Sequence, residues 1–181
     1  LPQNNENKPT AQNAYLLKEL STRPSAGSVA FATSSSQSVL VRFLEKVTGN
    51  VYEVGPDISG ENRLSNTTLP KVQEAYWNKT GTKLVARYEK SDSTTGIETY
   101  YAELTPATDG LGEGELKGSF LSGNIKSMTT DPDRSKIFYL LNYSDGSSGV
   151  ISDYDGSKKT GVFDSPLREW IPQWPTAQTI S

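Results

Sequence analysis

Histidine and cysteine are both absent from this 181-residue sequence. Without cysteine the chain has no disulfide and no thiolate nucleophile, and without either residue it lacks the usual ligands of a zinc site. Serine–histidine–aspartate hydrolysis within the chain is excluded for the same reason. An excess of one charge is missing too, because 18 Lys and Arg stand against 21 Asp and Glu, for a net charge of −3. This balance argues against nucleic acid or anionic lipid as the main partner.

Long hydrophobic runs are also missing. A membrane-spanning helix needs about 18 consecutive apolar residues, whereas the densest apolar stretch, Ile137–Leu141, is only as long as a strand. We therefore expect no direct membrane insertion. Hydrophobic residues make up 34% of the chain, and serine, threonine and glycine fill the remainder, which favours many short strands joined by turns. The length fits one domain.

The N-terminal region gives weaker signals. The first residue is Leu1, and no basic segment followed by an apolar one precedes the first expected strand, so we expect the natural chain to begin upstream. Residues 1–13 are polar and rich in asparagine and proline, which is typical of a linker or tail. Residues 14–20 fit either two helical turns or a strand; we favour a strand, because Leu20 aligns with Leu64 ahead of the next repeat.

An internal repeat organises the rest of the chain. Its anchor positions are separated by 45, 53 and 44 residues, and they are Ala32, Trp77, Thr130 and Trp174. A polar turn and then an apolar run follow each of the first three anchors, the runs being Val39–Phe43, Leu84–Tyr88 and Ile137–Leu141. Glycine-containing turns lead from these runs into a third set of expected strands, at 51–54, 97–104 and 150–154. A weaker fourth strand is expected around Gly161–Phe163 before the last anchor.

The apolar runs are apolar on both faces. Val41 and Phe43 share one face of their run while Leu40 and Leu44 share the other, so such a strand is sandwiched between layers. About four antiparallel strands in about 45 residues match the length and order of a β-propeller blade.

We therefore predict an all-β fold, a β-propeller of about four-stranded antiparallel blades. The domain would span residues 14–181, as an incomplete arc of three blades at about 20–63, 64–117 and 118–163 and the start of a fourth at 164–181. Propellers close with typically four to eight blades, so we expect the remaining blades to follow C-terminally.

Two segments carry a resemblance to a known family. Residues 63–70 lead to Ala75-Tyr76-Trp77-Asn78-Lys79-Thr80-Gly81-Thr82-Lys83, and this phrase resembles the repeat of TolB-like β-propellers: a Trp, a Ser-Pro-Asp-Gly-Lys-like turn and an apolar strand. The turn at 130–136 keeps the Pro-Asp core without the Gly, and Tyr154-Asp155-Gly156-Ser157 resembles the Asp-Gly turn late in the blade. Residues 163–175 look like a phrase in propellers of bacterial envelope proteins of unassigned role. The first repeat departs most, with Ala32 for the Trp and serines at 34–36.

The acidic turns are the first candidate sites. Asp153, Asp155 and Gly156 form a short D-x-D-G, and Asp131 and Asp133 form D-P-D. A calcium loop needs six to eight oxygen ligands from a longer pattern, so we interpret these residues as turn residues that cap their own backbone. A sialidase-type Asp box is not matched, because position 154 is tyrosine.

Aromatic and glycine-rich segments are the remaining candidates. Trp77 and Trp174 share a repeat position, which favours packing between blades. Trp170 and Trp174 are four apart and would share one face of a strand near Pro172, as core or, alternatively, as a sugar-stacking platform. Residues 110–114 lack the spacing of a phosphate loop, so we expect a flexible insert. Sequons at Asn66, Asn78 and Asn142 occur at about the frequency expected by chance, and we assign them no role.

No catalytic, cofactor-binding or metal-binding residue emerges from these patterns. We therefore expect a non-enzymatic protein-binding or scaffolding propeller, with a protein partner and no cofactor or nucleic acid. The resemblance implies an exported, periplasmic or cell-surface location, although a chain without cysteine is equally compatible with the cytoplasm. Two alternatives stay open: a hydrolase or lyase that uses the propeller channel or accompanies a separate catalytic domain, and a glycan-binding module.

Overall fold

The computed structural model describes residues 17–33, 38–55, 60–90, 96–105, 107 and 113–176. Within them the chain is all-β, with no helix, and forms three separate four-stranded antiparallel sheets, none of them closed. Accordingly, the described residues contain no helix long and apolar enough to cross a membrane. The predicted tail at 1–13 and the insert residues 110–112 lie outside the described residues.

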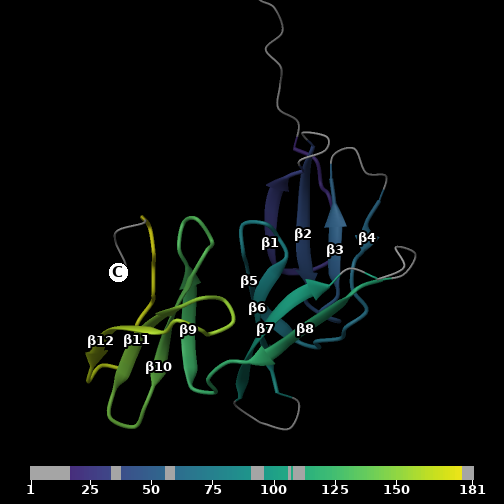
Figure 1. Ribbon diagram of the computed structural model, residues 1–181. Coiled ribbons are helices and arrows are strands. Elements are labelled where there is room, and N and C mark those ends of the chain that lie inside the picture. The colour runs from purple at the N-terminus through teal and green to yellow at the C-terminus, as the bar shows by residue number, and fades with distance from the viewer. Residues whose placement is uncertain are drawn as a thin grey trace, which may run out of the picture.

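Each sheet is a meander whose strands follow one another in chain order. Sheet 1 contains β1 (Ser25–Ala32), β2 (Val39–Glu45), β3 (Val51–Val54) and β4 (Asn62–Arg63). Sheet 2 contains β5 (Val72–Trp77), β6 (Lys83–Glu89), β7 (Ile97–Thr105) and β8 (Glu115–Phe120). Sheet 3 contains β9 (Ile125–Thr130), β10 (Ile137–Asn142), β11 (Ser147–Ser152) and β12 (Thr160–Ser165). In Figure 1 the first strands β1, β5 and β9 face the middle of the molecule, while β4 and β12 lie at opposite outer edges.

The repeat positions coincide in space. Ala32, Trp77 and Thr130 are each the last residue of the first strand of their sheet. Ala32 and Thr130 pair with the first residue of the second strand, and Trp77 pairs with Leu84, the second residue of β6. The backbone carbonyl just before each first strand, at Pro24, Lys71 and Asn124, accepts a hydrogen bond from the last residue of the second strand or, in sheet 1, from the residue after it. The three sheets are thus built on one plan.

Side-chain hydrogen bonds in the turns after Trp77 and Thr130 show why the chain reverses direction there. Asn78 Oδ1 accepts the N–H groups of Thr82 and Lys83 at 3.0 and 2.9 Å, and Asp131 Oδ1 accepts those of Ser135 and Lys136 at 2.6 and 2.8 Å. An asparagine or aspartate that satisfies the backbone two or more residues on is a strong local turn signal.

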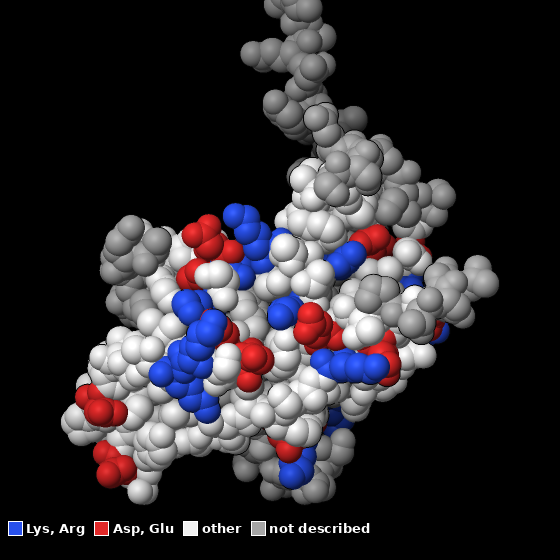
Figure 2. Space-filling view, viewed as in Figure 1, with Lys and Arg blue, Asp and Glu red and all other residues white. Residues whose placement is uncertain are grey.

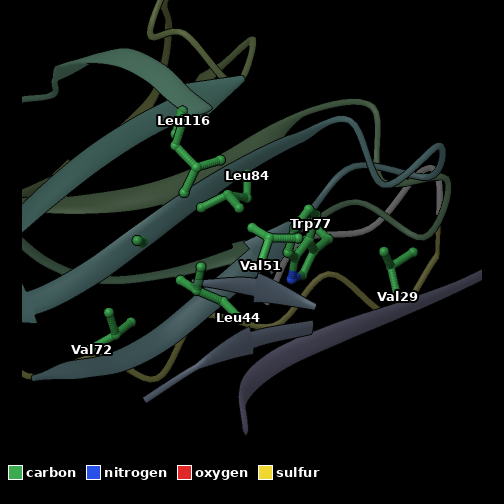
Figure 3. Packing of buried hydrophobic residues seen from close by; sticks show 9 residues of the cluster. Val29, Leu44, Val51, Val72, Trp77, Leu84 and Leu116 are labelled. Carbon is green, nitrogen blue, oxygen red and sulfur yellow. The ribbon is translucent and has the colours of Figure 1, made fainter. Parts of the chain in front are cut away.

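The two faces of each central strand pack against different sheets. In β6, Leu84 and Ala86 belong to a core shared with sheet 1, whereas Val85 belongs to a core shared with sheet 3. Figure 3 shows Leu84, Leu116 and Trp77 of sheet 2 directed toward Leu44 and Val51 of sheet 1. Strands buried on both faces were predicted from the apolar runs, and the structure confirms them for β6 and β10, in which Leu84–Ala86 and Ile137–Leu140 are buried.

A pair of arginines also joins neighbouring sheets. Arg42 and Arg87 occupy the same position of the second strand, counted from the anchor pair. Arg42 donates to the carbonyl of Gly81 in the turn after β5 at 3.0 Å, and Arg87 donates to the carbonyl of Lys126 in β9 at 2.8 Å. Each guanidinium therefore ties its own sheet to the backbone of the next one. Leu140 stands at this position in sheet 3.

Two boundary predictions were wrong. Residues 17–20 form no strand, and Leu17 is fully exposed. Leu20 and Leu64, whose likeness favoured the strand, both lie in the connections that precede β1 and β5. The third strand of the last repeat is Ser147–Ser152 rather than 150–154. Tyr154 lies in the turn beyond it, and its ring is buried between sheets 2 and 3.

Candidate functional site: the outer face of the third sheet

The side of sheet 3 that faces away from sheet 2 is apolar. Strand residues alternate between faces, so Ile137 and Tyr139 point toward sheet 2 while Phe138 and Leu140 point to the outer face. Gly149 in β11 lies opposite Leu140, and an added Cβ there would come within 2.6 Å of the Phe163 ring and 3.0 Å of the Phe138 ring. Glycine at this position therefore makes room for two aromatic rings on the outer face.

The chain after β12 partly covers this face. Ser147 Oγ donates to the Leu167 carbonyl at 2.6 Å, and the Trp170 ring lies with its centroid 5.3 Å from that of Phe163. The Trp170 indole N–H closes the local turn by donating to the Leu167 carbonyl at 3.2 Å. Residues 167–170 thus lie across the edge of the outer face.

The cover is thin and apolar toward solvent. Leu167 is 61% exposed, Trp170 41% and Ile171 84%. Between the cover and the sheet lies a cavity of about 240 Å³. Its lining is entirely uncharged: Phe138, Leu140, Val162, Phe163, Trp170, Ile171 and Pro172. Such a cavity offers no acid, base or nucleophile, but it fits apolar side chains.

Sheet 3 and the segment that follows it contain buried polar atoms without a hydrogen-bond partner. Ser127 pairs with Leu140 and so lies on the outer face. Its hydroxyl is buried without a hydrogen-bond partner, as are Asn142 Oδ1 at the end of β10 and Nε1 of Trp174. Buried polar groups in folded proteins are rarely left unpaired. Three polar atoms in and after sheet 3 therefore lack the hydrogen bonds that folded proteins usually provide.

The outer face of sheet 1 is closed in a different way. Phe43, Tyr52 and Val54 are buried there. The Arg23 guanidinium lies 4.4 Å from the centre of the Tyr52 ring and pairs with Glu61, so a cation and its partner cover the aromatic surface. The two ends of the stack are therefore unlike.

The acidic turns cap their own backbone. Asp131 accepts from Ser135 and Lys136, and Asp155 accepts the Ser157 N–H at 2.9 Å and its hydroxyl at 2.6 Å. Hydrogen bonds from Ser157 hold the pKa of Asp155 below its usual value. The turn-capping interpretation is confirmed for these two residues. Within the described residues no three Asp or Glu side chains gather as a metal site would need.

Asp153 is paired rather than capped. Its two carboxylate oxygens lie 2.8 Å from Lys136 Nζ and 2.9 Å from Lys158 Nζ. Hydrogen bonds from these two ammonium groups lower the pKa of Asp153. Asp133 lies only in a loose pair, 3.8 Å from Lys79, and both side chains are well exposed.

The tryptophans divide into two kinds. Trp77 is 2% exposed and packs between sheets 1 and 2, where its indole N–H donates to the Gly27 carbonyl at 3.0 Å. Packing between sheets is thus confirmed for Trp77. Trp170 and Trp174 do not lie on a strand, so the prediction that they share a strand face was wrong. The segment contains Pro166, Pro172 and Pro175, which donate no backbone hydrogen bond.

Arg134 is a residue that the sequence interpretation missed. It takes the place of Gly81 in the matching turn: the N–H of Gly81 donates to Asn78 O at 3.1 Å, and that of Arg134 to Asp131 O at 2.9 Å. Both have positive φ, 66° for Gly81 and 52° for Arg134. A non-glycine residue in this region costs roughly 1–2 kcal/mol. The repeat alignment, which sets Arg134 opposite a glycine, carried the signal.

The sequence matches no family model and no curated protein.

Proposed function

We propose that this chain is an arc of a β-propeller of the TolB-like kind, and that it serves as a non-catalytic, protein-binding scaffold in the bacterial envelope. The observation that carries this proposal is the apolar outer face of sheet 3. Three sheets of one plan, each packed face to face on the next, support the interpretation of the sheets as successive blades.

The partner that best fits the outer face is a further four-stranded antiparallel sheet of the same repeat, which we expect C-terminal to this segment. Both existing interfaces use the face of the central strand that Phe138 and Leu140 occupy in sheet 3: Leu44 of β2 packs on sheet 2, and Val85 of β6 packs on sheet 3. The uncovered face thus continues an interface that the molecule already forms twice. Trp174, which aligns with Trp77, would then take the place between sheets 3 and 4 that Trp77 takes between sheets 1 and 2.

The two alternative functions, a glycan-binding module and a hydrolase or lyase, have less support from the structure. Trp170 presents a half-exposed ring beside the cavity, so a saccharide is a competing occupant of this face. The apolar cavity at this face is lined by no ionisable group, so it offers a hydrolase or lyase no acid or base.

The test has two parts: the sequence of the whole gene, which should encode further repeats, and a measurement of docking between them and this chain. The sheets that we expect to follow are expressed separately and mixed with this chain, and complex formation is followed by isothermal titration calorimetry. Ile171→Asp places a charge on the outer face at a residue that supports no core, and it should abolish docking. Val47→Asp is the matched control, because Val47 is 64% exposed in the turn after β2 on sheet 1.

Wild type and Val47→Asp should bind alike. Equal binding by Ile171→Asp, or a gene that encodes no further repeat, would overturn the proposal. Binding of oligosaccharides to wild type that Trp170→Ala abolishes would instead establish the glycan alternative.

A further inference from the structure

A second hollow lies away from the outer face of sheet 3, at the end of sheets 2 and 3 where their first turns meet. It has a volume of about 340 Å³, enough for a small organic molecule. Sheet 2 contributes Asn78, Lys83 and Tyr101, and sheet 3 contributes Arg134, Ser135, Asp153, Tyr154 and Asp155. Figure 2 shows basic and acidic side chains interspersed on the face that sheets 2 and 3 present in this view.

Several residues that line this groove are held in place by burial and by hydrogen bonds. Tyr101 and Tyr154 are buried, and the Tyr154 hydroxyl crosses between sheets to donate to the Trp77 carbonyl at 2.8 Å. The Asn78 carboxamide oxygen is held by its own turn. The backbone N–H of Lys79 reaches the Arg134 carbonyl at 3.3 Å and links the two turns. A ligand would therefore meet a largely preformed site.

The acids of the groove have close partners, whereas its cations do not. Asp153 is paired with two lysines at less than 3 Å, and Asp155 is capped by Ser157. Lys83 Nζ lies 3.8 Å from the Glu103 carboxylate, longer than a charge-assisted hydrogen bond. Within the described residues Arg134 meets no carboxylate, and its guanidinium makes only a 3.4 Å contact with the Ser28 carbonyl.

Arg134 also stands where the turn prefers glycine. In sheet 2 the equivalent Gly81 lies against sheet 1, and an added Cβ would meet the Phe31 ring at 3.0 Å. In sheet 3 the equivalent Arg134 side chain lines the groove, and its guanidinium also reaches the Ser28 carbonyl of sheet 1 at 3.4 Å. Strained backbone at a residue that projects into a hollow is a frequent mark of a functional position.

We propose that this groove binds a small organic carboxylate, with Arg134 as the bidentate donor and Lys83 as a second cation. The planar guanidinium fork matches the two oxygens of a carboxylate. The buried tyrosine rings would contact the carbon skeleton of the ligand. This site is separate from the proposed docking face, so either proposal can fail without the other.

Succinate serves as the probe, with succinamide as its uncharged counterpart. Each is titrated into the chain at an ionic strength held constant with sodium chloride, and amide chemical shifts at Lys83, Arg134 and Ser135 are followed by NMR. Succinate should give saturable shifts at these amides and succinamide none. Equal responses to both compounds, or saturable shifts with inorganic phosphate alone, would overturn the proposal.

Arg134→Gly is the decisive variant, since Gly81 shows that glycine suits this turn. We expect the apparent dissociation constant for succinate to rise about tenfold or more, with an unfolding temperature no lower than that of wild type. Lys159→Ala is the matched control, because it removes the same charge from an exposed residue outside the groove lining. Lys83→Gln provides an independent variant with little structural consequence. Unchanged affinity in both Arg134→Gly and Lys83→Gln would refute the assignment.

Discussion

Trp77 tests the claim that the sheets are stabilised by packing face to face. Its ring is almost fully buried between sheets 1 and 2, and its N–H is paired with Gly27. Truncation of a buried tryptophan to alanine costs about 3–5 kcal/mol, and the Gly27 carbonyl would also lose its donor. For a chain of this size, 1 kcal/mol corresponds to roughly 2–4 °C in unfolding temperature. Trp77→Ala should therefore lower the unfolding temperature by roughly 10 °C.

Trp170→Ala is the matched control, because it removes the same side chain from a partly exposed position on the outer face. It should cost about 1 kcal/mol or less, the contact with Phe163 being the main loss. Both variants are measured by urea unfolding, followed by far-UV circular dichroism, and by calorimetry. Equal losses in the two variants, or a loss for Trp77→Ala near that of a surface substitution, would contradict the packing of sheet 1 on sheet 2.

Three further predictions concern the turns, the first strands and the tyrosines. Asp131→Asn should change the free energy of unfolding by less than about 0.5 kcal/mol in urea unfolding, because Asn78 makes the same turn, whereas Asp131→Ala should cost about 1–2 kcal/mol. Gly27→Ala should destabilise strongly by the same assay, since its Cβ would lie 2.0 Å from the Ala75 carbonyl oxygen, whereas Gly161→Ala, with open space around it, should be nearly neutral. Burial, followed by a neighbouring glutamate, raises the pKa from 10 to about 12 in three tyrosines, Tyr76, Tyr88 and Tyr101. The folded state therefore keeps these three protons to a higher pH than the unfolded state does. The contribution of the protonated tyrosines to the free energy of unfolding is complete below pH 10 and is lost as the pH rises through 12. Tyrosinate absorbance and urea unfolding between about pH 9 and 12 will check this loss.

The central strands were predictable from the sequence because their burial on both faces leaves a continuous apolar run. Ile137–Leu141 has that composition, and it lies in β10 with sheet 2 on one side and the aromatic outer face on the other. The turns were predictable as well, because their asparagine and aspartate side chains act locally. Spacing between such local signals was enough to reveal the repeat.

The first strands were harder, because their composition reflects contacts between sheets. β1 reads SAGSVAFA, with few strong strand formers. Its small residues are explained by the close approach of β5, where the Ala75 carbonyl oxygen leaves no room for a side chain at Gly27. β11 begins with two serines and a glycine for a similar reason, because Gly149 admits two aromatic rings. Local sequence patterns do not reveal the neighbouring strand or ring that requires a glycine or another small residue at these positions.

The candidate sites were less predictable still, since each depends on groups from separate repeats. Arg134 and Lys83 line one groove although they are 51 positions apart in the sequence. The cavity on sheet 3 joins strand residues to the proline-containing segment that we had interpreted as a strand. Neither arrangement follows from linear spacing, although the glycine-to-arginine difference within the repeat pointed toward the first.

The two ends of the stack differ in a way that bears on the proposed docking of a further sheet. At sheet 1 a polar clamp of Arg23 and Glu61 covers the aromatic surface, so a new sheet docking there would have to displace an ion pair. At sheet 3 the repeat position held by Arg42 and Arg87 is Leu140, so this position supplies no guanidinium to a partner's carbonyls. Docking on sheet 3 would therefore depend on apolar contact and shape, and its strength would follow the apolar area removed from water. Docking of this kind would cover the exposed apolar side chains at this end, among them Leu167 and Ile171.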